Sequence, residues 1–278
     1  MMYRPSLKSN RSLIILLLLA ILLFYIAQTS YIKVRTDNYE AKLASAQLMK
    51  AAMDSLTAEL HNRNLEIDPI DDPLQTGLIG IRLSSITTDR GLLSEKRAAL
   101  NPNLAAIFVE ELSKLKLMPG DYIAVGITGS NPAVNIALYS ALQVMELNPK
   151  IIVALSSASY GANRPELTWL DIEKILKEKG LFNFSSSYAS LGGKEDLAIG
   201  LSDNGILALR EAMSRNNVPL LIGSDLADNI DIRMAAYEEL LPAGERYKAF
   251  VNIGTGIANV GSEPNANLIP EGINRSLA

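Results

Sequence analysis

The pattern of hydrophobic and polar positions divides the chain into three parts. An uncharged apolar run comes first, a long amphipathic segment follows, and short apolar runs then alternate with amphipathic stretches. The first run, residues 12–32, reads SLIILLLLAILLFYIAQTSYI. Twenty-one residues at about 1.5 Å per residue are long enough to cross a hydrocarbon core of about 30 Å. The run therefore predicts a transmembrane anchor.

The flanks of this run predict its orientation. Arg4, Lys8 and Arg11 precede it, and no acidic residue does. Basic residues beside the first span tend to stay in the cytoplasm, so residues 1–11 are expected there. The residues after the run are then expected outside the cytoplasm. The protein is therefore expected to be a single-pass protein of the cell membrane, with the lipid bilayer as a partner of the apolar run.

A cleaved signal peptide is the rival interpretation of the same run, because its densest apolar stretch, residues 13–27, is only 15 residues long. Residues 27–30, AQTS, make a poor small-x-small cleavage site. Tyr25 and Tyr31 suit the membrane interface, which favours a retained anchor. A buried helix of a soluble protein is the third interpretation.

The amphipathic segment, residues 36–64, lacks Gly and Pro and is rich in good helix formers. It carries an apolar stripe with spacings of three and four: Leu43, Ala46, Met49, Ala52, Met53, Leu56 and Leu60. Residues 33–67 are therefore expected to form a juxtamembrane helical stalk that packs on the chain's own domain. A surface for a partner helix is the alternative. Two prolines in residues 68–74 mark the entry to the next domain.

Residues 68–262 show the alternation typical of parallel α/β proteins. The expected strands are 78–86, 121–126, 150–155, 184–191, 218–223 and 247–253. The expected helices are 101–116, 132–148, 168–179, 203–215 and 231–241. Residues 87–100 are expected to form a loop or short hairpin, and residues 263–278 a loop tail. This order predicts a three-layer α/β domain with a mostly parallel, Rossmann-like sheet.

Composition excludes several kinds of chemistry. The chain has no cysteine and a single histidine, His61, which falls in the predicted stalk. Thiolate nucleophiles, Cys-ligated metals and a histidine general base in the α/β domain are therefore excluded. No cofactor is expected, although oxygen ligands leave magnesium or calcium open. Asp225, Asp228 and Asp231 are the acidic set for such an ion, but helix capping is the favoured interpretation.

The net charge of −4 becomes −7 once the three basic residues before the apolar run are set aside. Nucleic-acid binding depends on a basic face that neutralises phosphates. No nucleic-acid partner is therefore expected.

Polar loops at the carboxyl ends of the predicted strands are the candidate ligand sites, because open α/β sheets bind ligands there. The first follows the strand at 121–126 and opens the helix at 132, where backbone N–H groups suit an anion. The second follows the strand at 150–155, and the third follows the last strand. Their candidate ligand-binding residues are Gly126, Thr128, Gly129, Ser130, Asn131, Ser157, Ser159, Asn163, Arg164, Gly254, Thr255 and Gly256. A turn with no ligand is the alternative for each loop.

Catalysis through these loops would need a hydroxyl nucleophile without histidine. Ser130 and Thr128 are weak candidates, with Lys96, Lys150 or Lys194 as bases, and the spacing selects none of the three.

Several segments together resemble the bacterial poly-gamma-glutamate system protein family. They are TGLIG at 76–80, SITTDRGLLSEKRAALNPN at 85–103, GDYIAVGITGSNPAVN at 120–135, SSASYGANRPELTWLDIEKIL at 156–176 and GLSDNG at 200–205. The resemblance covers about residues 70–260 and follows an N-terminal anchor. It implies a protein that accompanies the membrane machinery making and exporting poly-gamma-glutamate.

The resemblance implies no catalytic residues. The synthetase itself is an ATP-dependent ligase, and this chain lacks the G-x-x-x-x-G-K-[ST] loop. The chain is therefore expected to be an accessory subunit of a poly-gamma-glutamate synthesis or export system, binding or positioning polymer or partner subunits. A serine- or threonine-based hydrolase or transferase acting on the polymer's amide bonds is the first alternative. An exported domain that binds a small anionic ligand is the second.

Overall fold

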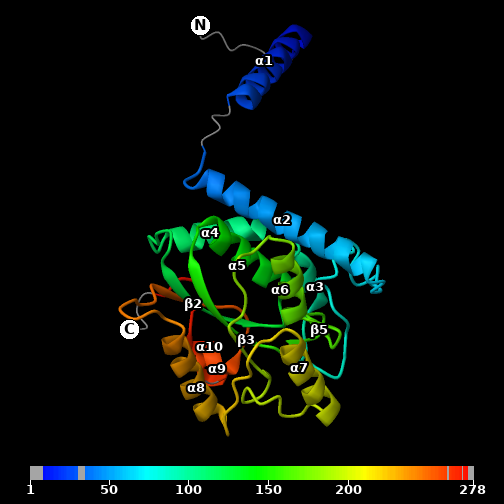
Figure 1. The fold of residues 1–278 in the computed structure, drawn as a ribbon. Coiled ribbons are helices and arrows are strands. Elements are labelled where there is room, and N and C mark those ends of the chain that lie inside the picture. The colour runs from blue at the N-terminus through cyan, green and yellow to red at the C-terminus, as the bar shows by residue number, and fades with distance from the viewer. Residues whose placement is uncertain (1–8, 31–34, 262, 271, 275–278) are drawn as a thin grey trace. The chain divides into compact units, whose positions relative to one another are not determined.

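The computed structural model describes residues 9–30, 35–261, 263–270 and 272–274 (Figure 1). Contacts divide the chain into two units, Met1–Tyr39 and Glu40–Ala278. In the first unit, α1 (Asn10–Thr29) is an apolar helix with no buried residue. Of the described helices, it is the one long and apolar enough to cross a membrane, and a signal sequence would pass the same test. Tyr31, the second expected interfacial tyrosine, lies outside the described residues.

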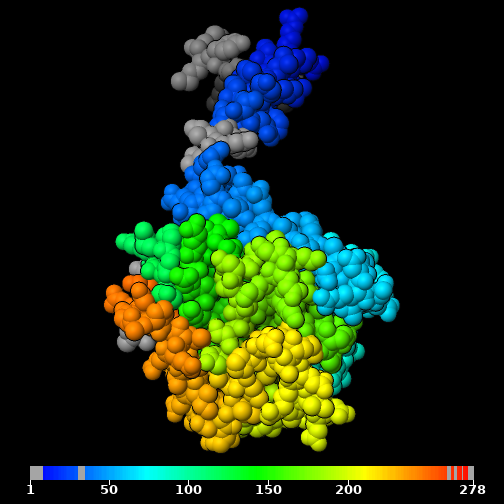
Figure 2. All heavy atoms as spheres, viewed as in Figure 1, coloured from blue at the N-terminus to red at the C-terminus, as the bar shows by residue number. Residues whose placement is uncertain are grey.

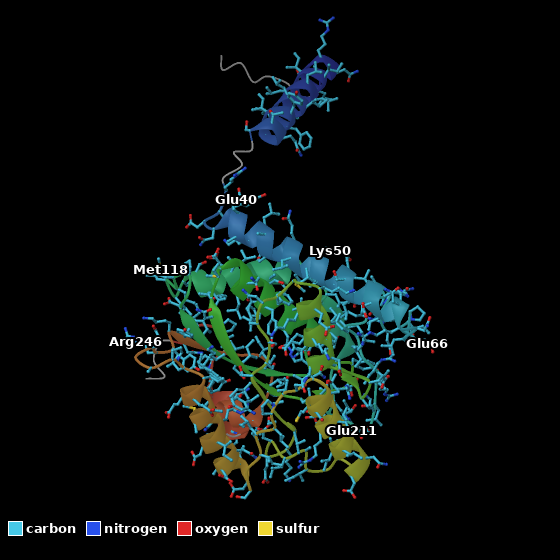
Figure 3. All side chains as sticks on the ribbon, in the orientation of Figure 1. Glu40, Lys50, Glu66, Met118, Glu211 and Arg246 are labelled. Carbon is cyan, nitrogen blue, oxygen red and sulfur yellow. The ribbon has the colours of Figure 1, made fainter. Side chains whose placement is uncertain are left out.

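In the second unit, α2 (Tyr39–Asn62) packs on the α/β domain, as its apolar stripe predicts (Figures 1 and 2). Its buried residues are Ser45, Met49, Ala52, Met53, Leu56 and Leu60. Glu59 forms an ion pair with Lys179 at 2.9 Å. Lys50 is exposed on the outer side of the helix (Figure 3). Leu43 was expected in the stripe but is 40% exposed, so the packed face is narrower than predicted.

A four-stranded parallel sheet lies at the centre, in the order β7-β3-β2-β8. Its strands are β2 (Tyr122–Thr128), β3 (Asn148–Ala154), β7 (Tyr188–Ser190) and β8 (Ala249–Asn252). Helix α5 (Pro132–Val144) connects β2 to β3, which confirms the predicted βαβ unit. Helix α6 (Trp169–Glu178) precedes β7. Two small pairs complete the strands: β1 (Thr87–Asp89) is parallel to β4 (Ser157–Ala158), and β5 (Asn163–Arg164) is antiparallel to β6 (Leu167–Thr168). The protein is thus mixed α/β with mostly parallel strands.

Helices cover both faces of the central sheet (Figure 1). Helices α4 (Asn103–Ser113), α5, α6 and α7 (Asp203–Arg215) share one core with the β2 residues Ile123, Val125 and Ile127. On the opposite face, α8 (Leu226–Glu239) packs Ala236 and Tyr237 against Ala124 and Ile152. Strands covered on both faces read as continuous apolar runs, which is why 121–126 and 150–155 were readily predicted.

The expected strand at 78–86 is wrong. The alternating pattern is present, but its backbone groups bond to a loop and a side chain instead of a strand. The Gly80 N–H donates to the Tyr160 carbonyl, and the Ile81 N–H donates to Asn163 Oδ1. The following region was also mispredicted, because it contains β1 and the helix α3 (Leu93–Ala98) instead of a loop or hairpin.

Three C-terminal expectations need correction. Residues 218–223 make only a single bridge, Leu220 to Ala189, because Pro219 has no N–H to extend a ladder. The helix expected at 231–241 begins five residues earlier, at Leu226, where Asp225 is the N-cap. The tail at 263–278 is not all loop, since it contains α10 (Glu263–Leu268), and a further helix, α9 (Ile257–Val260), lies between β8 and this tail.

The predicted capping box at the start of α6 is confirmed. Asp171 Oδ2 accepts hydrogen bonds from the N–H of Thr168 and from its hydroxyl, both at 2.7 Å. Burial raises the pKa of Asp171, but hydrogen bonds from Arg215, Asn216 and Thr168 together outweigh it and lower the pKa. The sequence therefore located this helix start from a local pattern, and Arg215 of α7 reinforces it.

Glu173 predicts a pH dependence of stability. Its carboxylate is buried, where it accepts hydrogen bonds from Tyr139 and Ser186. Burial is the largest influence and raises the pKa of Glu173 above its usual value. The folded state therefore binds this proton more tightly than the unfolded state does. The stability that protonated Glu173 contributes is fully present below the pKa of the unfolded state and is lost as pH rises through the pKa of the folded state.

Glu173→Gln should therefore gain stability relative to the parent as pH rises from about 4 to about 8, by about 1.4 kcal/mol per unit of pKa difference. Urea unfolding of the full chain in detergent at several pH values measures this difference. The exposed Glu178→Gln is the control. Parallel stability curves for Glu173→Gln and the parent would contradict the prediction.

Candidate functional site

The turn between β2 and α5 is the centre of the candidate site. Thr128 is buried, its hydroxyl accepts from the Ser130 N–H at 3.3 Å, and its carbonyl accepts from Asn135 Nδ2 at 2.9 Å. At Gly129, an added Cβ would lie 2.6 Å from the Leu155 carbonyl oxygen. A larger residue would push the two strand ends apart, so glycine is required there.

The loop after β3 lies directly on this turn, as adjacent parallel strands predict. Ser130 Oγ accepts from the Ala158 N–H at 3.0 Å. Ser157 Oγ donates to the Gly129 carbonyl at 3.1 Å, and the Ala162 N–H donates to the same oxygen at 2.8 Å. The hydroxyls of both loops thus hold the loops together.

Three residues of the second loop do not converge with the others. Asn163 is fully buried, and its side chain bonds to the N–H and the carbonyl of Ile81, at 2.9 and 2.6 Å. Arg164 lies 3.9 Å from Glu166 in the β5–β6 hairpin. Ser159 Oγ lies 3.4 Å from the Asp89 carbonyl oxygen. These contacts give the three residues structural roles beside the loops.

The third loop meets the first at Thr128. Gly254 has a φ of +90°, and an added Cβ would lie 2.4 Å from Thr128 Oγ1. An added Cβ at Gly256 would lie 3.2 Å from Thr128 Cγ2, whereas Thr255 is exposed. Gly126, in β2, lies against the side chain of Asn259 in α9. All three predicted loops therefore come together around the end of β2.

Lys96 of α3 is the residue whose importance the sequence did not reveal. It is only 7% exposed, and its ammonium donates to the Ser130 carbonyl at 2.7 Å and to Asn131 Oδ1. Both acceptors are neutral, and no carboxylate in the described residues forms an ion pair with it. Desolvation by burial lowers the pKa of Lys96.

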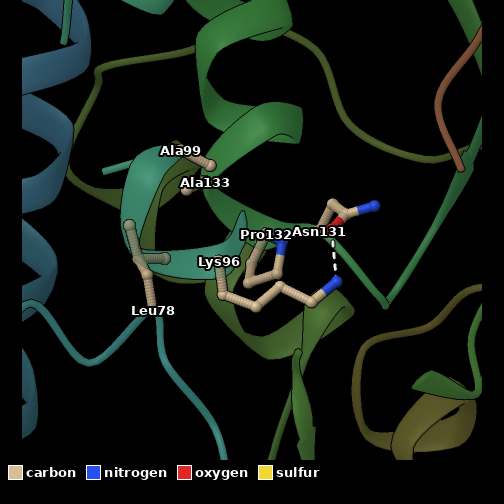
Figure 4. Close-up of a pocket in the computed structure, with 6 residues that line it drawn as sticks. All are labelled: Leu78, Lys96, Ala99, Asn131, Pro132 and Ala133. Atoms are coloured by element: carbon tan, nitrogen blue, oxygen red, sulfur yellow. Dashed lines mark hydrogen bonds between the residues drawn. The ribbon is translucent and has the colours of Figure 1, made fainter. Parts of the chain in front are cut away.

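A shallow depression with no room for an enclosed water molecule lies beside this ammonium (Figure 4). Its lining consists of Leu78, Lys96, Ala99, Asn131, Pro132 and Ala133. The sequence named Lys96 only as one of three candidate bases. Lys150 instead lies over the Tyr122 ring, near the amino ends of the strands, and Lys194 is exposed. No local pattern marks Lys96, because its partners are about 35 residues away in sequence.

The acidic set near α8 has a structural role. Asp225 accepts from the Asp228 N–H at 2.9 Å, which confirms the capping interpretation for Asp225. Asp228, in the first turn of α8, accepts from the Ser224 N–H at 2.8 Å. Asp231 lies exposed within the helix. In the part of the chain that the structure describes, no three His, Cys, Asp or Glu residues gather as a metal site.

The arrangement defines an α/β protein with a polar loop cluster at the carboxyl edge of its parallel sheet. Comparisons with family models, curated proteins and solved structures gave no match to this chain. The family resemblance therefore stays a prediction, and function has to be argued from the site.

Proposed function

We propose that this chain is a membrane-anchored accessory subunit of a poly-gamma-glutamate synthesis or export system. Its N-terminus is cytoplasmic, α1 is the anchor, and the α/β domain outside the membrane binds or positions polymer or partner subunits. The apolar α1, the basic residues before it and the sequence resemblance support this function.

The order of the strands supports binding at the loop cluster. From β2 the sheet grows towards β3 and β7 on one side, and β8 joins β2 on the other. This reversal, with helices on both sides of the sheet, supports the proposal that the domain is Rossmann-like. Ligands of such sheets bind at the crevice where the strand order reverses. Thr128, Gly254 and Gly256 lie there.

One observation favours binding over catalysis. The Ser130 and Ser157 hydroxyls and the Lys96 ammonium all bond to groups of the loops themselves. A nucleophile needs a base within about 3 Å to take its proton, and no Lys, His, Asp or Glu of the described residues is hydrogen-bonded to Ser130 Oγ. The contacts of Ser130 and Lys96 instead fix the shape of a binding site.

Co-purification and polymer analysis test the proposed function. The full chain should co-purify with the polymer synthetase from membranes, and a strain lacking residues 40–278 should lose polymer. Returning the full chain to this strain should restore polymer, and detection of residues 1–39 in the membrane fraction checks expression and insertion. Normal polymer yield and length in the deletion strain would overturn the proposal.

A serine hydrolase or transferase is the second candidate, favoured by the position of Lys96 on the backbone of Ser130. Ser130→Ala separates the two functions. If the domain binds, the variant should fold and leave polymer length unchanged, because the substitution removes only one neutral hydrogen bond, worth about 1 kcal/mol of stability. Gel analysis of released polymer measures this, with Ser113→Ala on α4 as the control. A loss of polymer processing of a hundredfold or more would favour the enzyme.

A further inference from the structure

The short segment 254–261, which includes α9, lies over β2 at the point where the strand order reverses. Asn259 of α9 occupies the space above Gly126, since a Cβ added to Gly126 would lie 2.5 Å from Asn259 Nδ2. Gly126 is flanked in the sheet by Ile152 of β3 and Asn252 of β8. Ligands of open α/β sheets bind beside such a reversal. A side chain of the protein itself therefore fills part of the place that a ligand would take.

The segment 254–261 is weakly fastened to the rest of the domain. Among the described residues, its hydrogen bonds to the sheet both involve the Asn252 side chain, which donates to the Gly254 carbonyl and accepts from Asn259 Nδ2, each at 2.9 Å. None joins it to α8, although α9 packs against that helix (Figure 1). Ala258 is the one buried residue of the segment. So few contacts mark a part of the chain that opens at low cost.

Glycines stand at both ends of the segment. Gly254 has a φ of +90° and Gly261 a φ of +86°, and these backbone angles are unstrained only in glycine. A few residues at the ends of a moving segment absorb the change in backbone angles and act as hinges. Residues 254–261 can therefore swing as a unit while β8 and α8 stay folded.

The hydrogen bonds of Asn252 select the group that can replace the Asn259 side chain. Because Asn252 Nδ2 donates to Gly254, its Oδ1 faces Asn259 and accepts. An amide has the N–H and the planar shape of the Asn259 side chain, whereas a carboxylate would place two acceptors together. Asn259 Oδ1 is buried with no partner among the described residues, and such an unsatisfied atom lowers the cost of withdrawing this side chain.

We propose that residues 254–261 form a lid over the end of β2, with Asn259 held in the place of a ligand's amide group. Rotation at Gly254 and Gly261 withdraws Asn259 and leaves Gly126 and Asn252 to receive that amide. The inference rests on the proposed function for the source of the amide, because the units of poly-gamma-glutamate are joined by amide bonds.

A single introduced cysteine tests the opening, because the chain has none of its own. Thr128 is buried against Gly254 and Gly256 of the lid, and Ser140 is buried in α5. In the full chain in detergent, N-ethylmaleimide should label Thr128→Cys at least tenfold faster than Ser140→Cys, which reacts only on unfolding.

Substitution of Asn259 tests its part in closure. Added to Thr128→Cys, Asn259→Ala should speed the labelling about fivefold, because it removes the bond to Asn252. Asn259→Asp, which keeps the shape but cannot donate, should do the same. Asn183→Asp, at an exposed position outside the lid, should leave the rate unchanged.

Chemical rescue tests the choice of an amide. In the chain with Thr128→Cys and Asn259→Ala, acetamide should restore the slower labelling, because it fills the vacated place beneath the closed lid. Acetate at the same concentration should not. A gamma-glutamyl oligomer should slow the labelling at a lower concentration than acetamide does.

The outcomes separate the lid from the proposed function. Equal labelling of Thr128→Cys and Ser140→Cys, or unchanged labelling with both Asn259 substitutions, would overturn the lid. Rescue by acetate as complete as by acetamide would overturn the amide assignment. Rescue by acetamide with no effect of the oligomer would support the lid and reject the polymer as its ligand. A failed lid with successful co-purification would leave the accessory function standing, and a working lid with normal polymer in the deletion strain would reject that function alone.

Discussion

Replacing Asp196 by asparagine, or Arg233 by methionine, should lower the free energy of unfolding by about 3–5 kcal/mol. The two side chains are almost fully buried, and Arg233 Nη2 lies 2.8 Å from Asp196 Oδ2. Ser190 Oγ bonds to both, at 2.7 and 2.8 Å. This group ties α8 to the end of β7, and either substitution leaves one charge buried without its partner.

The hydrogen bonding of the Asp196–Arg233 pair is incomplete, which makes an apolar double substitution the right control. Arg233 Nε and Nη1 are buried with no hydrogen-bond partner in the described part of the chain. The double substitution Asp196→Leu with Arg233→Met should therefore recover most of the lost stability, since apolar replacements of buried ion pairs are often neutral or stabilising. Urea unfolding of the full chain in detergent measures all three. Asp54→Asn, which breaks the exposed pair with Lys50, should cost less than about 1 kcal/mol. Additive losses in the double variant would contradict this account.

The sequence predicted the elements whose signals are local. Strands β2 and β3 are apolar runs bounded by turns, and both were located within two residues. Pro132 marked the first turn of α5, and the Thr168–Asp171 box marked the start of α6. In each case the residues that specify the element are its own members or immediate neighbours.

Elements specified by distant residues were mispredicted. The segment 78–86 has a strand pattern, but its backbone partners are in the loop at 160–163, about 80 residues away. Residues 218–223 have the composition of a strand, yet Pro219 limits them to one bridge. Hydrophobic alternation shows which side of a segment is buried, but it does not show where the backbone hydrogen bonds go.

The sequence predicted where the candidate site lies, but not the roles of its individual residues. Parallel strands bring their carboxyl ends to one edge, so the meeting of the three loops followed from the predicted sheet. The roles of individual side chains did not follow, because a serine that bonds to a neighbouring backbone looks the same in sequence as one that binds a ligand. Lys96 lies in a charged stretch typical of solvent-exposed helices, and only the fold buries it.

The second large effect is expected for Asn163, a predicted ligand residue to which the structure gives a different role. Asn163→Ala should lower the free energy of unfolding by about 3 kcal/mol, because it removes bonds to both backbone groups of Ile81 and to Thr87 Oγ1, each worth about 1 kcal/mol. Chemical unfolding of the full chain in detergent measures the loss. Asn183→Ala, at an exposed position, should change stability by less than about 0.5 kcal/mol.

A neighbouring substitution tests whether this loss is specific to Asn163. Arg164→Ala, in the same hairpin, removes only the 3.9 Å pair with Glu166 and should cost less than about 1 kcal/mol. Equal losses of stability in Asn163→Ala and Arg164→Ala would contradict the structural role of Asn163. The segment 80–81 would then be held by the backbone hydrogen bonds that Gly80 and Ile81 make with Tyr160.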